Sequence, residues 1–237
     1  KNTYRGKDIT SYHNDGSLYE MISSGRFDDI YIGDYIKDSK NRIWFIADID
    51  NYLYTGDDKL TKHHVTIIPE KSLAVSNMND NDTTVGGYLG SKMFTNTLPA
   101  LLPEIESIFG ASHVLTYRAF HSSGMNEVGV NRFGEATGVA SGKKIVSRKI
   151  DLMSEINVYG VSIWSSSGFD VGLDNQQFSL FRLKPELKNA TLNGTYYNYW
   201  LKDIANKFGF VFAGGWGESE YANASAELAI RPSFLLG

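Results

Sequence analysis

The sequence predicts an α+β fold with short antiparallel strands, few helices and long loops. Three observations predict it. Apolar residues recur at helical spacing in only a few stretches, and short apolar runs bounded by Gly, Asn, Asp and Ser fill most of the remaining chain. The ten-residue helices that connect parallel strands do not alternate with these runs, so a doubly wound parallel sheet is disfavoured.

In the first part of the chain, these patterns predict one short helix and then three strands. The helix covers Ser17–Ser24 and ends at Gly25. The strands are Ile30–Ile32 and Ile43–Ala47, with the polar turn Lys37–Asn41 between them, and His63–Ile68, which ends at Pro69.

The middle of the chain combines polar loops with two further helices. Asn77–Asp82 and Gly86–Ser91 are predicted loops, and His113–Phe120 has the pattern of a strand. Leu98–Phe109 carries apolar residues at helical spacing and is followed by Gly110, a typical helix stop. Lys149–Tyr159 is predicted to be a helix, with Asp151 or Ser154 near its start. From Gly160 to Leu236, short apolar runs alternate with turns.

Composition and charge exclude several classes of protein. The chain of 237 residues has 23 Lys plus Arg against 27 Asp plus Glu, a net charge of −4, which disfavours a protein that grips nucleic acid through its phosphates. No apolar run is long enough for a membrane helix, so no membrane insertion is expected. The absence of Cys excludes disulfides, thiolate metal sites and cysteine nucleophiles. The start, Lys1–Lys7, lacks an initiator Met and a signal core, which indicates a fragment or a processed chain.

Few residues form a pattern that is typical of catalysis. His63 and His64 are adjacent in a predicted strand and so point to opposite faces, which favours structural roles. The run Ser165–Gly168 is no nucleophile elbow, and every His of the chain precedes it. Gly86–Gly90 lacks the Lys of a phosphate-binding loop. No cofactor is expected. Oxygen ligands for Ca²⁺ are present in Asn79–Asp82, Asp48/Asp50 and Asp57-Asp58, but none has EF-hand spacing.

The segment 196–237 has a different character. Aromatic residues make up 13% of the chain, and in this segment Trp216 and Tyr221 lie among small residues beside Glu218 and Glu220. Exposed aromatic rings with hydrogen-bonding neighbours are typical of binding hot spots. A strand pair with a glycine-rich connection is the structural alternative. We expect at least one of Trp216 and Tyr221 to face solvent.

At these residues the sequence resembles a known group. The ending Trp200-Leu201-Lys202-Asp203-Ile204-Ala205, Gly217, Ala224-Ser225 and Ile230–Phe234 resembles phage tail proteins with a C-type-lectin-like domain, and also the retroelement-diversified variable proteins of the major tropism determinant type. Shorter pieces at Arg5–Thr10, Phe27–Tyr35, His63–Pro69, Gly86–Met93 and Asp151–Gly160 extend the resemblance over nearly the whole chain. The implied fold is C-type-lectin-like, of the formylglycine-generating-enzyme-like subtype, over 1–237 as one domain at the C-terminal end of a longer protein.

The resemblance divides the C-terminal segment into a framework and a contact surface. The implied framework residues are Trp200, Leu201, Ala205, Gly217, Ala224, Ile230, Arg231 and Pro232. The implied ligand-binding residues are Asn206, Lys207, Phe208, Phe212, Gly214, Trp216, Glu218, Glu220, Tyr221 and Asn223. We expect Trp200, Leu201, Ile230 and Phe234 to be buried and the two termini to lie close together.

The function that this resemblance implies is receptor binding without catalysis. The chain would belong to the virion, at the tail tip of a phage or prophage, and would act outside the host cell on a bacterial surface protein or glycan. It would contact other tail subunits and form a homotrimer.

One alternative is a structural baseplate or tail module that contacts only other phage subunits. Another is a glycan-degrading enzyme that uses Glu218 and Glu220, although a glycine-rich loop is a poor mount for two catalytic carboxylates. Two features depart from the family: Lys202 stands where Arg is usual, and the loop contains little Asn.

Overall fold

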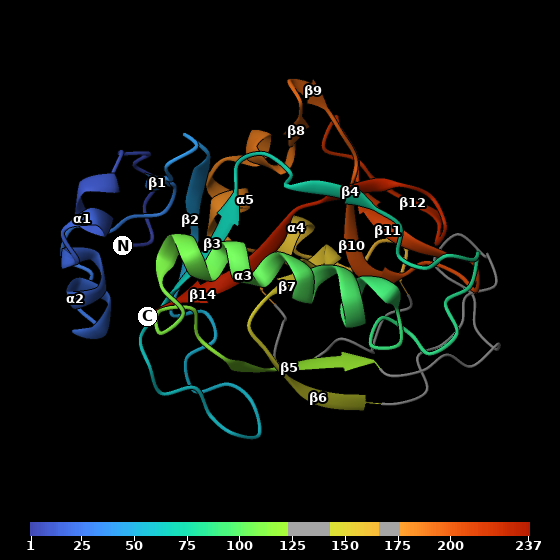
Figure 1. Ribbon diagram of the computed structural model, residues 1–237, viewed down its shortest axis with the longest axis horizontal. Helices are drawn as coiled ribbons and strands as arrows, with labels where there is room; N and C mark the ends of the chain where they lie inside the picture. The colour runs from blue at the N-terminus through green and yellow to red at the C-terminus, as the bar shows by residue number, and fades with distance from the viewer. Residues whose placement is uncertain (123–142, 166–175) are drawn as a thin grey trace.

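Two five-stranded sheets form the centre of the molecule (Figure 1). The computed structural model describes residues 1–122, 143–165 and 176–237. The first sheet has the strand order β1 (Tyr35–Lys37), β2 (Ile43–Ile49), β3 (Val65–Pro69), β14 (Pro232–Leu236) and β7 (Asp151–Leu152), and all its pairs are antiparallel. Every residue of β3 and β14 is buried, which explains their almost uninterrupted apolar sequence.

The second sheet has the order β12 (Ser219–Asn223), β11 (Gly209–Ala213), β10 (Tyr199–Ile204), β13 (Leu228–Ile230) and β4 (Ala74–Ser76). Its pairs are antiparallel except β10 with β13, which run parallel. Two short hairpins complete the described strands: β5 (Tyr117–Ser122) with β6 (Lys143–Arg148), and β8 (Thr191–Leu192) with β9 (Thr195–Tyr196). Figure 1 places β11 and β12 at the end of the molecule opposite the first two helices.

The described helices are short, apart from one. They are α1 (Thr10–Asn14), α2 (Ser17–Ser23), the π-helical turn η1 (Met93–Thr97), α3 (Leu98–Phe109), α4 (Glu155–Tyr159), α5 (Ser179–Leu183) and the 3₁₀ turn η2 (Pro185–Lys188). The predicted helix Leu98–Phe109 is confirmed with both its bounds, and Gly110 ends it with φ of 92°, a value that favours glycine. Among the described residues, no helix is long and apolar enough to cross a membrane.

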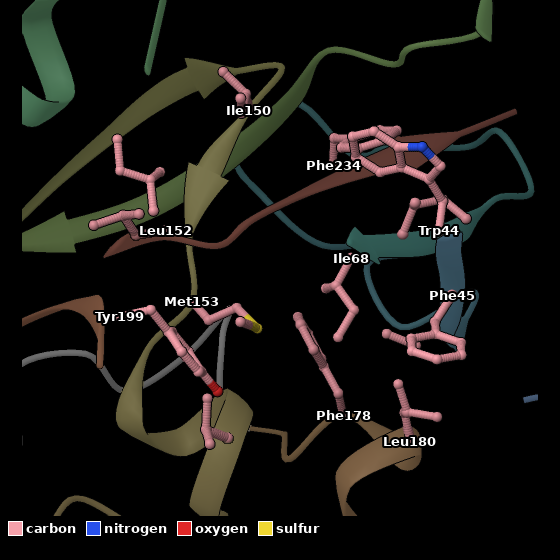
Figure 2. Packing of buried hydrophobic residues seen from close by; sticks show 14 of the residues in the cluster. Trp44, Phe45, Ile68, Ile150, Leu152, Met153, Phe178, Leu180, Tyr199 and Phe234 are labelled. Carbon is pink, nitrogen blue, oxygen red and sulfur yellow. The ribbon is translucent and has the colours of Figure 1, made fainter. Parts of the chain in front are cut away.

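Aromatic side chains from distant parts of the chain meet in the core. The Trp44 ring of β2 lies edge-on to Phe109 of α3 and Phe234 of β14, with centroids 5.5 and 5.8 Å apart. In Figure 2, Phe178 and Leu180 point from the start of α5 toward the strands that carry Ile68 and Phe45. The first sheet therefore packs against α3 through aromatic side chains of β2 and β14.

The buried framework of the C-terminal segment agrees with the prediction. Trp200, Leu201, Ile230 and Phe234 are fully buried, and so is Arg231. Both chain ends lie at the same end of the molecule, beside α1 and α2 (Figure 1). The Tyr19 ring of α2 stacks on His113 at 3.6 Å, and His113 in turn contacts the carbonyl of Gly237.

Two predicted elements are wrong. The predicted strand Ile30–Ile32 is reduced to an isolated parallel bridge between Ile32 and Tyr4, followed by a turn in which the Asp34 carboxylate accepts the N–H of Tyr31 and the Asp34 N–H bonds back to the Tyr31 carbonyl. The strand β1 instead begins at Tyr35 and includes Lys37, which we placed in the following turn. Asp38 closes that turn by accepting the N–H groups of Lys40 and Arg42.

The predicted helix Lys149–Tyr159 is a helix only in its second half. Asp151 and Leu152 form β7 and pair with Ser233 and Pro232 of β14. The helix α4 starts after Ser154, whose hydroxyl accepts the N–H of Asn157 while the Asn157 amide oxygen accepts the N–H of Ser154. A partner far away in the chain therefore overrides the local helical pattern.

Candidate functional site

All ten predicted contact residues lie on the β11–β12 hairpin or on the turns at its two ends. The hairpin is in continuous register, with Gly209 opposite Asn223 and Ala213 opposite Ser219. Asn206, Lys207 and Phe208 form the turn that leads into β11, whereas Gly214, Trp216 and Glu218 belong to the turn between β11 and β12. Six of the ten predicted residues thus form two groups separated by the length of one strand, and the other four lie on the strands themselves.

The turn at Trp216 is closed by short hydrogen bonds. The N–H of Gly214 donates to the carbonyl of Glu218 at 2.7 Å, and the N–H of Gly217 donates to the carbonyl of Gly214 at 3.0 Å. Gly217 has φ of 87°, which an L side chain adopts only with strain. The indole of Trp216 projects from this turn and is 85% exposed, so the expectation that Trp216 or Tyr221 faces solvent is confirmed.

Glu218 stabilises the same turn through its side chain. Its Oε2 accepts the N–H of Trp216 at 3.0 Å. The carboxylate folds over Gly214, where a Cβ atom would lie only 2.1 Å from Oε1. Gly214 is accordingly buried, and its role in the structure is to let the carboxylate approach the backbone.

Neighbouring elements hold this turn from outside. The Asn198 side-chain oxygen accepts the N–H of Gly215 at 2.9 Å, and the Tyr159 hydroxyl of α4 donates to the Glu218 carbonyl at 2.6 Å. The amide oxygen of Asn189 lies against Gly217, 2.8 Å from the place where a Cβ would stand. Three separate segments therefore fix the position of Trp216.

Tyr196 is a further exposed aromatic residue that we did not include among the contact residues. It belongs to β9 and is 56% exposed, and its ring lies 6.2 Å from the Trp216 ring at an interplanar angle of 36°. The signal that could have found it is weak, because Tyr196 is one of three Tyr within four residues and only its place in the fold separates it from the buried Tyr199.

The opposite end of the hairpin carries the residues Asn206, Lys207 and Phe208. Phe208 is 48% exposed, and the Lys207 ammonium lies 4.9 Å from its ring centroid. The Asn206 side-chain oxygen accepts the N–H groups of Phe208 and Gly209, both at 2.9 Å. The hydroxyl of Thr84 donates to the Asn206 carbonyl, so the loop before η1 crosses this end.

Asp82 attaches the loop before η1 to the end of β12. Its carboxylate accepts hydrogen bonds from Asn223 Nδ2 at 3.0 Å and from the hydroxyl of Ser225 at 2.6 Å. The Ser225 and Asn223 hydrogen bonds lower the pKa of Asp82 below its usual range. The predicted contact residue Asn223 is thus already engaged with a protein side chain.

The remaining predicted residues lie on the two faces of the hairpin. Tyr221 is half-buried, and its ring meets Trp164 edge-on at a centroid distance of 4.9 Å. Phe212 and Glu220 face each other in register on the other side, with Phe212 half-buried beside Trp200 and Glu220 exposed. Tyr221 is therefore part of the support for the hairpin, whereas Trp216 projects from its tip.

A second group of ionisable residues is buried between the sheets and the β5–β6 hairpin. Asp151 of β7 lies 3.0 Å from His121 Nε2, 3.8 Å from Lys202 Nζ and 3.9 Å from Arg148 Nε, and it accepts the hydroxyl of Tyr88. Burial alone would raise the pKa of Asp151, but the charges of His121 and Lys202 lower it overall. Burial, and then the Asp151 charge, raise the pKa of Tyr88 well above its usual value. This cluster connects four elements of the fold.

Five of the six carboxylates considered as calcium ligands, all except Asp58, have protein partners among the described residues. Asp80 pairs with Lys92, Asp57 with Arg118, Asp50 with His63, and Asp48 accepts from Ser179. His64 is buried and His63 half-exposed, but both precede β3, which begins at Val65 and not at the predicted His63, so strand alternation does not determine their burial. In the part of the chain that the structure describes, no three His, Cys, Asp or Glu residues gather into a group that could hold a metal ion. Ser166–Gly168 lie outside the described residues.

Comparison with models of protein families, with curated proteins and with solved structures returned no match. The assignment of a function therefore depends on the residues and on their arrangement in this chain.

Proposed function

We propose that the chain is a non-enzymatic binding module of a phage or prophage tail, which attaches the virion to the bacterial surface. The observation that supports it best is the indole of Trp216, which is 85% exposed on a turn fixed by at least five hydrogen bonds from the turn itself, Asn198 and Tyr159. A large exposed ring on a turn whose backbone is fixed contributes little to the fold and is well suited to contact a partner.

The environment of the two carboxylates supports binding over hydrolysis. A glycosidase needs two carboxyl groups that flank the scissile bond about 5–9.5 Å apart. Glu218 accepts the N–H of Trp216 and lies over Gly214, so its carboxylate is committed to the turn. Glu220 stands on the strand opposite Phe212. The assignment to a phage tail, its other subunits and a trimer comes from the sequence resemblance.

Attachment to bacteria tests this function. Fluorescently labelled protein is incubated with a panel of bacterial strains, and the parent is compared with Trp216→Ala. The matched control is Tyr54→Ala, which removes an aromatic ring that is 63% exposed in the loop between β2 and β3. We expect Trp216→Ala to lose attachment and Tyr54→Ala to retain it.

Equal attachment by the parent and Trp216→Ala would contradict the proposal. Binding only to isolated tail subunits, with no attachment to any strain, would instead favour a structural tail module. Thermal melting of each variant shows that it is folded before its attachment is compared.

A further inference from the structure

Trp216 and Tyr196 together form an open aromatic platform. Their ring centroids are 6.2 Å apart, the planes are tilted by 36°, and the rings are 85% and 56% exposed as whole residues. They come from different hairpins, since Tyr196 lies in β9 and Trp216 in the β11–β12 turn. The platform is thus a product of the fold and is no local feature of one loop.

The shape of the platform disfavours an apolar protein side chain as its ligand. Such an anchor contributes most when a concave, well-packed pocket removes it from water. Three cavities lined by described residues, of about 510, 310 and 470 Å³, include neither Trp216 nor Tyr196. A ligand with a flat apolar face can cover the rings without a pocket.

The groups around the platform include both donors and acceptors of hydrogen bonds. Among the described residues, neither the indole N–H of Trp216 nor the hydroxyl of Tyr196 has a protein partner. The Asn189 amide oxygen and the carboxylate of Glu218, whose Oε2 already accepts the N–H of Trp216, lie at the same turn and have the capacity to accept further hydrogen bonds. Donors and acceptors around an aromatic face match a ligand whose hydroxyl groups both donate and accept.

From this juxtaposition we infer that Trp216 and Tyr196 bind a neutral sugar of a bacterial surface glycan. The inference rests on the proposed function and names its ligand class. One face of a pyranose ring presents C–H groups, which the negative face of an aromatic ring attracts, while the hydroxyls at the ring edge reach the surrounding polar groups. The two tilted rings can contact two neighbouring sugars of one chain.

The negative charge at the turn favours a neutral sugar over an anionic one. The Glu218 carboxylate bonds to the backbone of Trp216 itself, and the exposed Glu220 follows two residues later. These carboxylates repel uronic acids, phosphorylated sugars and sulfated sugars. Because the hydrogen bonds described above hold the turn before the ligand arrives, little ordering is required on binding.

An array of bacterial surface polysaccharides tests the inference. Each polysaccharide is presented untreated and after periodate oxidation, which opens sugar rings that carry vicinal hydroxyls. We expect the parent to bind at least one neutral polysaccharide and to lose it after oxidation. Trp216→Ala and Tyr196→Ala should each weaken binding about tenfold or more, the size expected of a hot-spot residue. Trp216→Phe should retain part of the affinity, and Tyr54→Ala all of it.

The attachment assay separates failure of this inference from failure of the proposed function. Loss of attachment after protease treatment of the bacteria, with attachment kept after periodate treatment, would identify a protein receptor and overturn the inference while leaving the binding function intact. Binding to none of the polysaccharides, or binding that Tyr196→Ala leaves unchanged, would also overturn it. Attachment that does not depend on Trp216 would contradict the proposed function itself.

Discussion

Two tryptophans in one sheet have opposite environments. Trp200 in β10 is fully buried, and its indole N–H donates to the Ser76 carbonyl of β4 at 2.9 Å. Trp216, on the turn beyond the neighbouring strand, is 85% exposed, and no described residue accepts its indole N–H. The same residue type thus serves the framework at one position and the surface at the other, and the difference is made by strand position alone.

This contrast extends to the residues around each tryptophan. Trp200 is opposite Phe212 in β11 and belongs to the same buried core as Ile230 and Phe234. Trp216 has glycines on both sides, and among the described residues Tyr196 is its one aromatic neighbour. The sheet therefore carries stability in its interior strands, while the tip of its edge hairpin is free to vary.

Trp200→Ala should have the largest effect on stability. Loss of a fully buried indole leaves a cavity and an unpaired Ser76 carbonyl, so the free energy of unfolding should fall by about 3–5 kcal/mol. Urea unfolding measures this difference. A loss below about 1 kcal/mol would show that the interior strands do not carry the stability that we assign to them.

Arg231→Met should have the next largest effect on stability. The buried guanidinium donates from Nε to the Pro69 carbonyl and from Nη1 to the Leu187 carbonyl, both at 2.9 Å, and Met preserves the apolar stem while leaving both carbonyls unpaired. At about 1–3 kcal/mol for each of these two groups, the unfolding free energy should fall by about 2–6 kcal/mol. Arg231→Lys, which keeps a donor, should lose less, and equal losses would argue against these hydrogen bonds.

Lowering the pH should destabilise the fold by protonating Asp151. Its pKa is lowered in the folded state, against an ordinary value of about 3.9, so its carboxylate stabilises the fold at higher pH and this contribution is lost as the pH falls below about 4. The parent should therefore lose stability progressively as the pH is lowered below about 4, the ordinary pKa of an Asp carboxyl. Asp151→Asn should lose less over the same range, although it starts from a lower stability. Parallel pH profiles would contradict the pairing with His121 and Lys202.

Asp82→Ala should have a smaller effect, because it acts at the surface. It removes the hydrogen bonds to Asn223 and Ser225 that attach the loop before η1 to the far end of the hairpin. We expect a smaller fall in melting temperature than for Arg231→Met, and no change in binding at Trp216. Loss of sugar binding in this variant would show that the two ends of the hairpin are coupled.

The parts of this structure that sequence patterns predicted are those with local signals. Leu98–Phe109 has helical periodicity and a glycine stop, and the burial of Trp200 and Ile230 was expected because they are large apolar residues in apolar runs of the chain. The exposure of Trp216 was expected because its neighbours are too small to cover it. These features depend on residues close together in the chain.

The features that were missed depend on distant partners. Asp151 and Leu152 form a strand because β14, about 80 residues later, pairs with them. The cluster around Asp151 brings together residues from four elements, and Tyr196 faces Trp216 only because β9 lies beside the β11–β12 turn. No spacing rule within a single segment reports such contacts.

The central claim is that Trp216 serves recognition and contributes little to folding. Measuring the free energy of unfolding and the attachment to bacteria for the same preparation of Trp216→Ala tests it most directly. We predict an unfolding free energy within about 0.5 kcal/mol of the parent, as for a surface substitution, together with attachment reduced about tenfold or more. A loss of about 2 kcal/mol or more in stability, or attachment equal to that of the parent, would contradict the claim.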